Sequence, residues 1–216
     1  MSPPKPATAP NRVVLEGRYV HLEPLAPGHT AALYRASTPP DAAERFAYLF
    51  ETPPASEADM QAWVEKAAAA ADPLMFAVVD QASGEARGRQ ALMRIVPEHG
   101  VIEIGSIYWG PGLAQTRGAT EALYLFARHI FDDLSYRRFE WKCNNLNQPS
   151  KRAAARFGFT FEGVFRQHMI VKGENRDTAW FSMLDSEWPA RKAALEAWLD
   201  PSNFDADGRQ RTALGR

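Results

Sequence analysis

The chain has 216 residues, of which 45% are hydrophobic and 24% charged, and its formal net charge is −1 at pH 7. This composition is typical of a globular protein, and the nearly balanced charge disfavours a dedicated nucleic-acid binder, which usually carries a clear basic excess. The single cysteine, Cys143, excludes an internal disulfide and favours a reducing, cytoplasmic compartment. No stretch approaches the roughly 18 apolar residues that a membrane-spanning helix needs, and the first ten residues do not resemble a secretory signal.

The first third of the chain predicts a tail, a strand and two helices. Residues 1–11 carry four prolines and are expected to form a disordered tail. Residues 18–23 alternate between apolar and polar side chains, which predicts a strand. Residues 29–36 predict a short helix that stops before two prolines. After an irregular stretch with several aromatic residues, Ser56 begins a capping-box pattern for a helix that includes Val64.

The middle of the chain predicts a sheet followed by a packed helix. Residues 74–80, 88–96 and 101–109 read as three strands joined by short turns, which predicts an antiparallel meander. The following helix, 119–134, has one apolar stripe with Glu121, Arg128 and Asp132 opposite, so these charges are expected to face solvent.

The last third predicts a strand, a short helix, a hairpin and a final helix. The strand covers 137–143 and the short helix 149–157. The hairpin pairs 162–171 with 176–184. Ser186 is expected to cap a last helix that ends near Asp200, and residues 201–216 are expected to form a polar tail. The order predicts one mixed α/β domain, residues 12–200, around a twisted and mostly antiparallel sheet.

The segment from Gly110 to Phe159 carries the most specific pattern. A Pro/Gly loop leads into Gln115-Thr116-Arg117-Gly118-Ala119-Thr120-Glu121-Ala122. Asn147-Gln148-Pro149-Ser150 then begins a helix that ends in Arg156-Phe157-Gly158-Phe159. In this order and spacing, the residues resemble the acyl-CoA half of a GNAT acetyltransferase, with the best match to the branch of ribosomal-protein N-terminal acetyltransferases. The resemblance covers about residues 12–185 and implies the GNAT fold, acetyl-CoA as cosubstrate and an amine as acceptor.

The start of the long helix is the expected phosphate site. A helix N-terminus presents unpaired backbone N–H groups and a partial positive charge, which suit a pyrophosphate. When the chain is aligned with the family pattern, Arg117 stands at the central glycine position, and Gly118 follows one residue after that position. An arginine there brings a Cβ into a tight turn but also a cation near the phosphates. The resemblance implies a cofactor site formed by Gln115, Thr116, Arg117, Gly118, Ala119 and Thr120; the alternative is an ordinary helix start with a solvated arginine.

The resemblance also implies a place for the pantetheine arm between two strands that diverge. Backbone groups of Ile107 and Trp109 would bond its amides from one side, and the Asn147 side chain from the other. The alternative for Asn147 is an ordinary helix cap.

Two residues are candidates for proton transfer. An alkyl ammonium with a pKa near 10 is almost wholly protonated at neutral pH, so a base or a water relay is needed. By resemblance Glu103 is the candidate base, with Glu140 on the neighbouring strand as its rival; the alternative for each is an ordinary strand glutamate that pairs with an arginine or faces water. The short helix has no tyrosine to protonate the leaving thiolate, so Ser150 takes that role by resemblance; the alternative is a bond to a backbone amide in the first helical turn.

The acceptor pocket of the family lies between the N-terminal helical segment and the final hairpin. The candidates here, each of which also fits a core or rim position, are Tyr48, Phe50, Trp141, Arg166 and His168. The five histidines show no metal-ligand spacing, so no metal is expected.

These patterns together predict an acetyl-CoA-dependent N-acetyltransferase whose acceptor attacks directly in a ternary complex. The acceptor would be a peptide or protein N-terminus or a small amine. The degenerate phosphate loop and the missing tyrosine favour an alternative, a non-catalytic acyl-CoA-binding module, and a plain interaction protein is a second alternative. A variant of the enzyme modifies a polycationic acceptor such as an antibiotic or a polyamine, and an acidic cleft around Glu51, Glu103 and Glu140 would support it. The apolar residues of the last helix also allow a homodimer.

Overall fold

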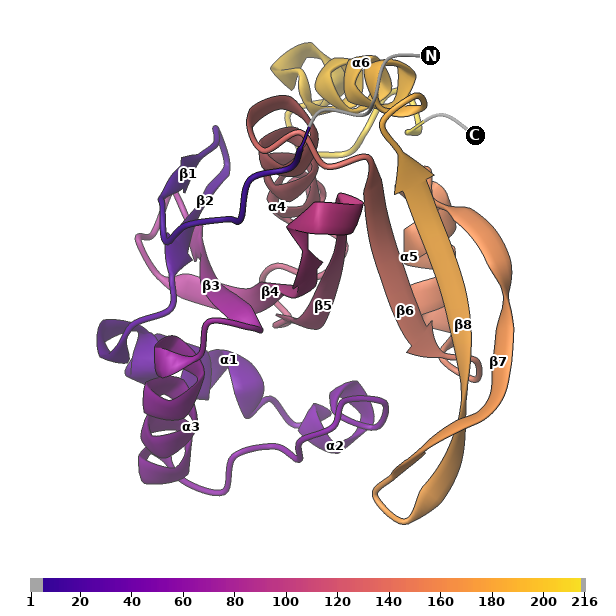
Figure 1. The fold of residues 1–216 in the computed structure, drawn as a ribbon. Helices are drawn as coiled ribbons and strands as arrows, with labels where there is room; N and C mark the ends of the chain where they lie inside the picture. The colour runs from indigo at the N-terminus through magenta and orange to yellow at the C-terminus, as the bar shows by residue number, and fades with distance from the viewer. Residues whose placement is uncertain (1–5, 215–216) are drawn as a thin grey trace.

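The computed structural model describes residues 6–214, so part of the expected tail, residues 1–5, lies outside the described chain. An eight-stranded sheet in the order β1-β2-β3-β4-β5-β6-β8-β7 forms its centre (Figure 1). β5 and β6 are parallel and all other neighbours are antiparallel. The predicted mixed α/β fold and its antiparallel meander are confirmed. The strands are β1 (Leu15–Glu16), β2 (Val20–Pro24), β3 (Leu74–Asp80), β4 (Ala86–Val96), β5 (Val101–Trp109), β6 (Arg138–Asn144), β7 (Thr160–Val171) and β8 (Glu174–Leu184).

Helices cover both faces of this sheet. Side chains of β3 alternate between two apolar clusters, because successive residues of a strand point to opposite faces. Phe76 joins the cluster that contains α4, whereas Met75 joins the cluster that contains α1 and α3. The predicted mostly apolar run of β3 is thus explained by burial on both sides. The helices are α1 (Thr30–Ser37), α2 (Ala42–Arg45), α3 (Glu57–Ala69), α4 (Arg117–Arg128), α5 (Gln148–Arg156) and α6 (Trp188–Leu199).

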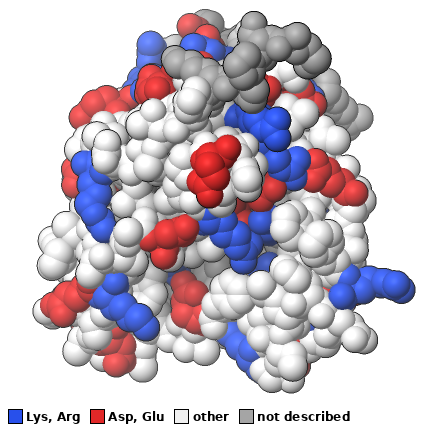
Figure 2. Space-filling view, viewed as in Figure 1, with Lys and Arg blue, Asp and Glu red and all other residues white. Residues whose placement is uncertain are grey.

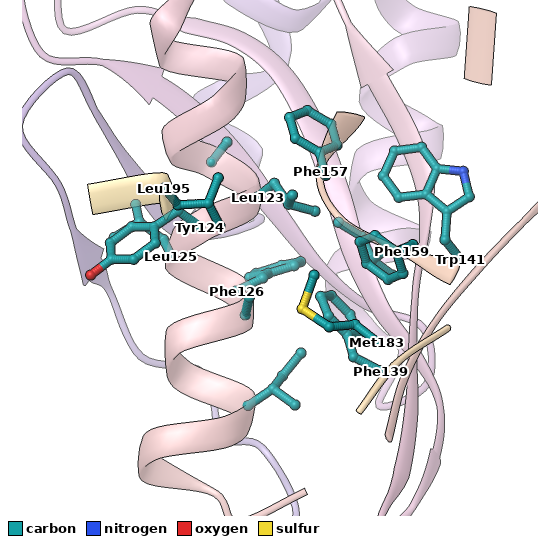
Figure 3. Packing of buried hydrophobic residues seen from close by; sticks show 14 of the residues in the cluster. Leu123, Tyr124, Leu125, Phe126, Phe139, Trp141, Phe157, Phe159, Met183 and Leu195 are labelled. Atoms are coloured by element: carbon teal, nitrogen blue, oxygen red, sulfur yellow. The ribbon is translucent and has the colours of Figure 1, made fainter. Parts of the chain in front are cut away.

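The larger cluster packs α4 against the centre of the sheet. In Figure 3, Phe126 of α4 points toward Phe139 and Met183 of the strands, and all three side chains are buried. Phe126 also meets Phe76 edge to face at a centroid distance of 5.2 Å. Burying one such side chain stabilises the fold by about 1.5–3 kcal/mol. This packing holds α4 firmly and therefore fixes the position of its N-terminus.

The prediction for Glu121 was wrong. It was placed on the solvent face of the helix, but its side chain is 5% exposed. Its carboxylate accepts hydrogen bonds from the backbone N–H groups of Arg18, Tyr19 and Val20 at 2.9, 2.6 and 2.8 Å. A charged group can be buried when several donors satisfy it, and helical periodicity carries no information about those donors. Beyond Arg128 the α-helix gives way to a π-helical turn.

Two predictions for the C-terminal region also need correction. α6 is preceded by Glu187 rather than capped by Ser186, and its N-cap makes no side-chain hydrogen bond. The segment after Asp200, expected as a polar tail, folds back along α6. There Gln210 accepts a hydrogen bond from Trp198 at 2.8 Å, and Leu214 is buried.

The β7–β8 hairpin is long and projects past the end of β6 (Figure 1). Its register shifts between Phe165 and Met169, and Gln167 lies in this shift with a φ of +49°. A β-bulge of this kind bends the strand and redirects side chains. As a result, the hairpin reaches toward the segment around α2, which the sequence left without an assignment.

Candidate active site

A large cleft opens where β5 and β6 diverge. The two strands are paired from Val101↔Arg138 to Ile104↔Trp141 and no further. Beyond that point β5 stays paired with β4 and β6 stays paired with β8. The backbone of β5 after Gly105 therefore has no neighbouring strand on the β6 side. The cleft has a volume of about 1430 Å³ and runs from the α4 N-terminus to α2 and the β7–β8 hairpin.

The N-terminus of α4 faces this cleft. Gln115 precedes the helix with a φ of +63°, so the tight turn falls on this residue and not on Arg117. Thr116 is the N-cap, and its side chain accepts a hydrogen bond from the Ala119 N–H. Arg117 begins the helix, and its guanidinium lies 4.3 Å from the centre of the Tyr19 ring. The expected conflict between the Arg117 Cβ and a tight turn does not arise.

Gly118 has a packing role at this helix start. A Cβ on it would lie 3.0 Å from Val20 Cγ1 and 3.2 Å from Leu113 Cδ1, so glycine allows α4 to approach β2 closely. Gly118 does not line the main cleft. The other residues expected at this loop, Gln115, Thr116, Arg117, Ala119 and Thr120, do line it.

Arg156 is a cation at this end of the cleft that the sequence analysis missed. Its Nη1 donates a hydrogen bond to Thr120 Oγ1 at 3.1 Å, and its guanidinium lies 4.7 Å from the centre of the Trp198 ring. It forms no ion pair with the described residues, and burial lowers its pKa. The sequence placed Arg156 at the end of the short helix, but only the tertiary fold brings it next to the α4 N-terminus.

The residues expected to meet a pantetheine arm lie along the divergence. Ile107 and Trp109 lie on β5 beyond its last pair with β6, Ile104↔Trp141, and both line the cleft. Asn147 is the N-cap of α5, and its Oδ1 accepts the Ser150 N–H at 3.1 Å. The side-chain oxygen of Asn147 therefore acts as an ordinary helix cap, which was the alternative to a contact with the cosubstrate. Its amide nitrogen has no hydrogen-bond partner in residues 6–214 and remains able to donate.

Ser150 sits at the same end of α5 and lines the cleft. Its Oγ accepts a hydrogen bond from Trp141 Nε1 at 3.0 Å, and its hydroxyl hydrogen faces the Cys143 thiol, whose pKa is raised by burial and lowered by this hydrogen bond. Trp141 was expected as a substrate residue. It is buried between Phe157 and Phe159, with ring centres 6.1 and 5.8 Å away, and only an edge of it reaches the cleft.

Glu103 lies on the floor of the cleft within a network of charges. Its Oε2 accepts from Arg94 Nη1 and from Lys142 Nζ, both at 2.8 Å. Lys142 also contacts Glu140 Oε2 at 2.7 Å. Glu103 lines the cleft, whereas Glu140 does not. No protein donor within residues 6–214 bonds Glu103 Oε1, so this oxygen is available to a water molecule or a substrate.

The far end of the cleft is formed by the α2 region and the hairpin; we call it the acceptor end. Tyr48 and Phe50 line it and are 38% and 57% exposed. His168 lines it from β7, with its Nδ1 3.0 Å from Thr178 Oγ1. Arg166 does not: it is exposed and lies outside the cleft, so the structure does not support it as a substrate contact. Glu51 is paired with the buried Arg89.

Charges of both signs are interspersed over the face shown in Figure 2, without a large patch of one sign. Within the cleft region, the three carboxylates that were considered for an acidic acceptor site, Glu51, Glu103 and Glu140, are each paired with arginine or lysine. They do not form the acidic cleft that a polycationic acceptor would require. Among residues 6–214 no three His, Cys, Asp or Glu side chains come close enough to hold a metal ion, and no helix is long and apolar enough to cross a membrane.

Comparison with known proteins identifies the family. The family model for the acetyltransferase (GNAT) domain matches residues 20–160. The chain belongs to the GNAT acetyltransferase family. A solved GCN5-related N-acetyltransferase from Brucella melitensis is 60% identical with a TM-score of 0.95, covering 97% of this chain and 95% of that one. A GNAT-family acetyltransferase from Chromobacterium violaceum is 39% identical with a TM-score of 0.79, covering 86% and 92%.

Two further similar proteins are more distant. The N-acetyltransferase p20 of Bacillus licheniformis is 29% identical over 117 residues, which is 52% of this chain and 63% of p20; the match thus spans less than two thirds of that relative. The acetyltransferase of Salmonella typhimurium that modifies the N-terminal serine of a 50S ribosomal subunit protein is 20% identical, with a TM-score of 0.69 over 80% of this chain and 99% of that one. It shares the fold.

Proposed function

We propose that this GNAT chain transfers an acetyl group from acetyl-CoA to a primary amine by direct attack in a ternary complex. The observation that carries the proposal is the divergence of β5 and β6, which leaves one edge of β5 unpaired beside a helix N-terminus. An extended pantetheine arm can bond that edge as an added strand would. The first turn of α4, together with Arg156, provides N–H groups and positive charge for the phosphates.

The chemistry requires one bond to form and one to break. The amine lone pair attacks the thioester carbonyl carbon, and the carbon–sulfur bond then breaks. The thiolate must gain a proton, and the new ammonium must lose one. Ser150 is suited to the first task because Trp141 donates to its oxygen, so that its hydroxyl hydrogen can turn from the neighbouring Cys143 thiol to the sulfur of the cosubstrate.

Glu103 is the better candidate for the second task. It lies in the cleft and Glu140 does not. Arg94 and Lys142 both bond its Oε2, which fixes the carboxylate and leaves Oε1 without a protein donor among residues 6–214. We propose that Glu103 Oε1 holds a water molecule that relays the proton from the ammonium.

Turnover distinguishes this proposal from a non-catalytic acyl-CoA-binding module. The purified protein is incubated with acetyl-CoA and a panel of amines that includes peptides with free N-termini, amino acids and polyamines. Release of the free thiol is followed, and products are identified by mass spectrometry. We expect thiol release that depends on one class of amine. Binding of acetyl-CoA without turnover on any amine would support the binding module instead.

The cytoplasmic location and the homodimer that the sequence suggested stay predictions. Size-exclusion chromatography with light scattering tests the second of them directly.

A further inference from the structure

Arg176 is a buried cation at the acceptor end that forms no ion pair with residues 6–214. It lies near the start of β8, is 7% exposed and lines the cleft. Its guanidinium carbon is 5.1 Å from the centre of the Phe50 ring. Its Nε is buried without a hydrogen-bond partner. Within residues 6–214, no hydrogen bond or ion pair involves any of its side-chain nitrogens.

Three other cations at this end are paired with carboxylates. Arg45 is paired with Asp41 at 3.0 Å. Arg94 and Lys142 share Glu103, and Lys142 also contacts Glu140. A buried charge is normally paired, because taking it out of water is costly. Arg176 is an exception to this rule, and it lies at the end of the cleft where an acceptor would enter.

Burial is the main influence on the Arg176 charge. It lowers the pKa of the guanidinium, whereas Cys143 and Glu103 act in the opposite direction and Arg94 in the same direction as burial. An anion that bonds the guanidinium directly would offset the cost of taking this charge out of water.

The shape of the group indicates which anion. A guanidinium presents its N–H donors in a planar fork that matches the two oxygens of a carboxylate. The phosphates of acetyl-CoA are the other anions available, but their proposed site is the N-terminus of α4, where Arg156 lies. Arg176 instead lies with Phe50 from the α2 region and opposite Met169 of β7.

We propose that Arg176 binds a carboxylate of the acceptor, and that the substrate is therefore an amine that carries a carboxylate near the amino group, such as an amino acid or a short peptide with an acidic residue close to its N-terminus. This inference rests on the proposed acetyl transfer. It adds a binding residue and a substrate class to it and excludes polyamines.

The test measures binding and turnover separately. N-acetylated amino acids, which are the products of the proposed reaction, and their matching primary amides are titrated into the protein by calorimetry. The corresponding free amino acids and amino-acid amides are compared as acceptors with acetyl-CoA. The variants are Arg176→Gln and Arg176→Lys. Arg35→Gln, which removes an exposed arginine that lies outside the cleft, is the matched control.

We expect the wild-type protein and Arg35→Gln to bind at least one acid roughly tenfold more tightly than its amide, which is the ratio that a charge-assisted hydrogen bond provides. Arg176→Gln should lose this preference through a raised KM for the acid alone, with an unchanged affinity for acetyl-CoA. Arg176→Lys should keep part of it, because the charge remains but the fork is lost.

Equal binding of acids and amides by the wild-type protein would overturn the inference, and this comparison needs no variant to fold. A loss of acetyl-CoA affinity in Arg176→Gln would also overturn it, since the guanidinium would then serve the cosubstrate. Turnover without a preference for acids would leave the proposed acetyl transfer intact and overturn the carboxylate site at Arg176. Preferential binding of acids without turnover on any amine would support the carboxylate site and overturn the proposed acetyl transfer.

Discussion

Glu121 connects α4 to the start of β2, and its removal should lower both stability and acetyl-CoA affinity. Its carboxylate accepts three backbone N–H groups, of which the Val20 donor is buried and the Arg18 and Tyr19 donors are partly buried. The helix start beside it packs closely on β2 through Gly118. Loss of the carboxylate would therefore loosen the position of the helix N-terminus that faces the cleft.

The magnitude follows from the three bonds. A buried donor left unsatisfied costs about 1–3 kcal/mol, and donors that water can reach cost less. For Glu121→Ala we therefore estimate a loss of about 4 kcal/mol, made up of one full penalty, two smaller ones and the loss of packing. For a chain of this size, each kcal/mol lowers Tm by roughly 2–4 °C, so Tm should fall by about 8–16 °C. Glu121→Gln should lose about half as much, because its carbonyl oxygen can still accept while its NH2 group opposes one N–H.

Thermal and urea unfolding measure the stability, and calorimetric titration measures the acetyl-CoA affinity. Glu174→Gln is the control, because Glu174 is exposed at the hairpin tip and makes no side-chain hydrogen bond or ion pair within the described residues. If Glu121→Ala melts within about 2 °C of the wild-type protein, the assignment of stability to these three bonds is refuted.

Four further predictions concern the cleft and its surroundings. Ser150→Ala should lower kcat roughly tenfold or more while the acetyl-CoA affinity stays close to wild type, and a weaker affinity with unchanged kcat would make Ser150 a binding residue only. Glu103→Gln should lower kcat at neutral pH and move the rising limb of the pH–rate profile upward; a wild-type profile from about pH 6 to 9 would remove Glu103 from proton transfer. Cys143 is buried, and burial raises the pKa of its thiol, so a thiol-specific reagent should modify it slowly in the folded protein and rapidly after unfolding; fast modification of the native protein would contradict its burial. Hydrogen bonds from Arg138 lower the pKa of Glu162 from 4.5 to about 2, so its contribution to stability is present above the unfolded pKa and is lost as the pH falls toward the folded value; the Tm difference between wild type and Glu162→Gln should therefore shrink from neutral pH to about pH 3, and a constant difference would contradict this account.

The sequence predicted the elements whose pattern is local. The mostly apolar run of β3, the helix cap at Ser56 and the apolar stripe of α4 each depend on residues a few positions apart, and each was found in the structure. The Ser56 side chain accepts the Asp59 N–H as expected. The resemblance to the GNAT family extended the prediction from single elements to the whole fold, because the order of the elements in the second half of the chain is specific to this family.

The sequence could not predict contacts between distant segments. Glu121 was assigned to solvent because its donors lie about a hundred residues earlier in the chain. Arg156 and Arg176 were missed for the same reason. The place of Arg156 depends on its hydrogen bond to Thr120, and Arg176 stands out only because its buried Nε has no hydrogen-bond partner among residues 6–214. Arg166, chosen by its place in the hairpin, is exposed because the β-bulge after Phe165 changes which side chains face the cleft.

The central claim is that the cleft between β5 and β6 binds acetyl-CoA, and thermal unfolding with and without this ligand tests it most directly. Ligand binding to the folded state adds RT ln(1 + [L]/Kd), which is about 2.7 kcal/mol at a hundredfold excess over Kd. For a chain of this size we therefore predict a rise in Tm of roughly 5–11 °C. The rise should be smaller in an Arg156→Gln variant, whose altered side chain lies beside the proposed phosphate site. An unchanged Tm at millimolar acetyl-CoA would contradict the account.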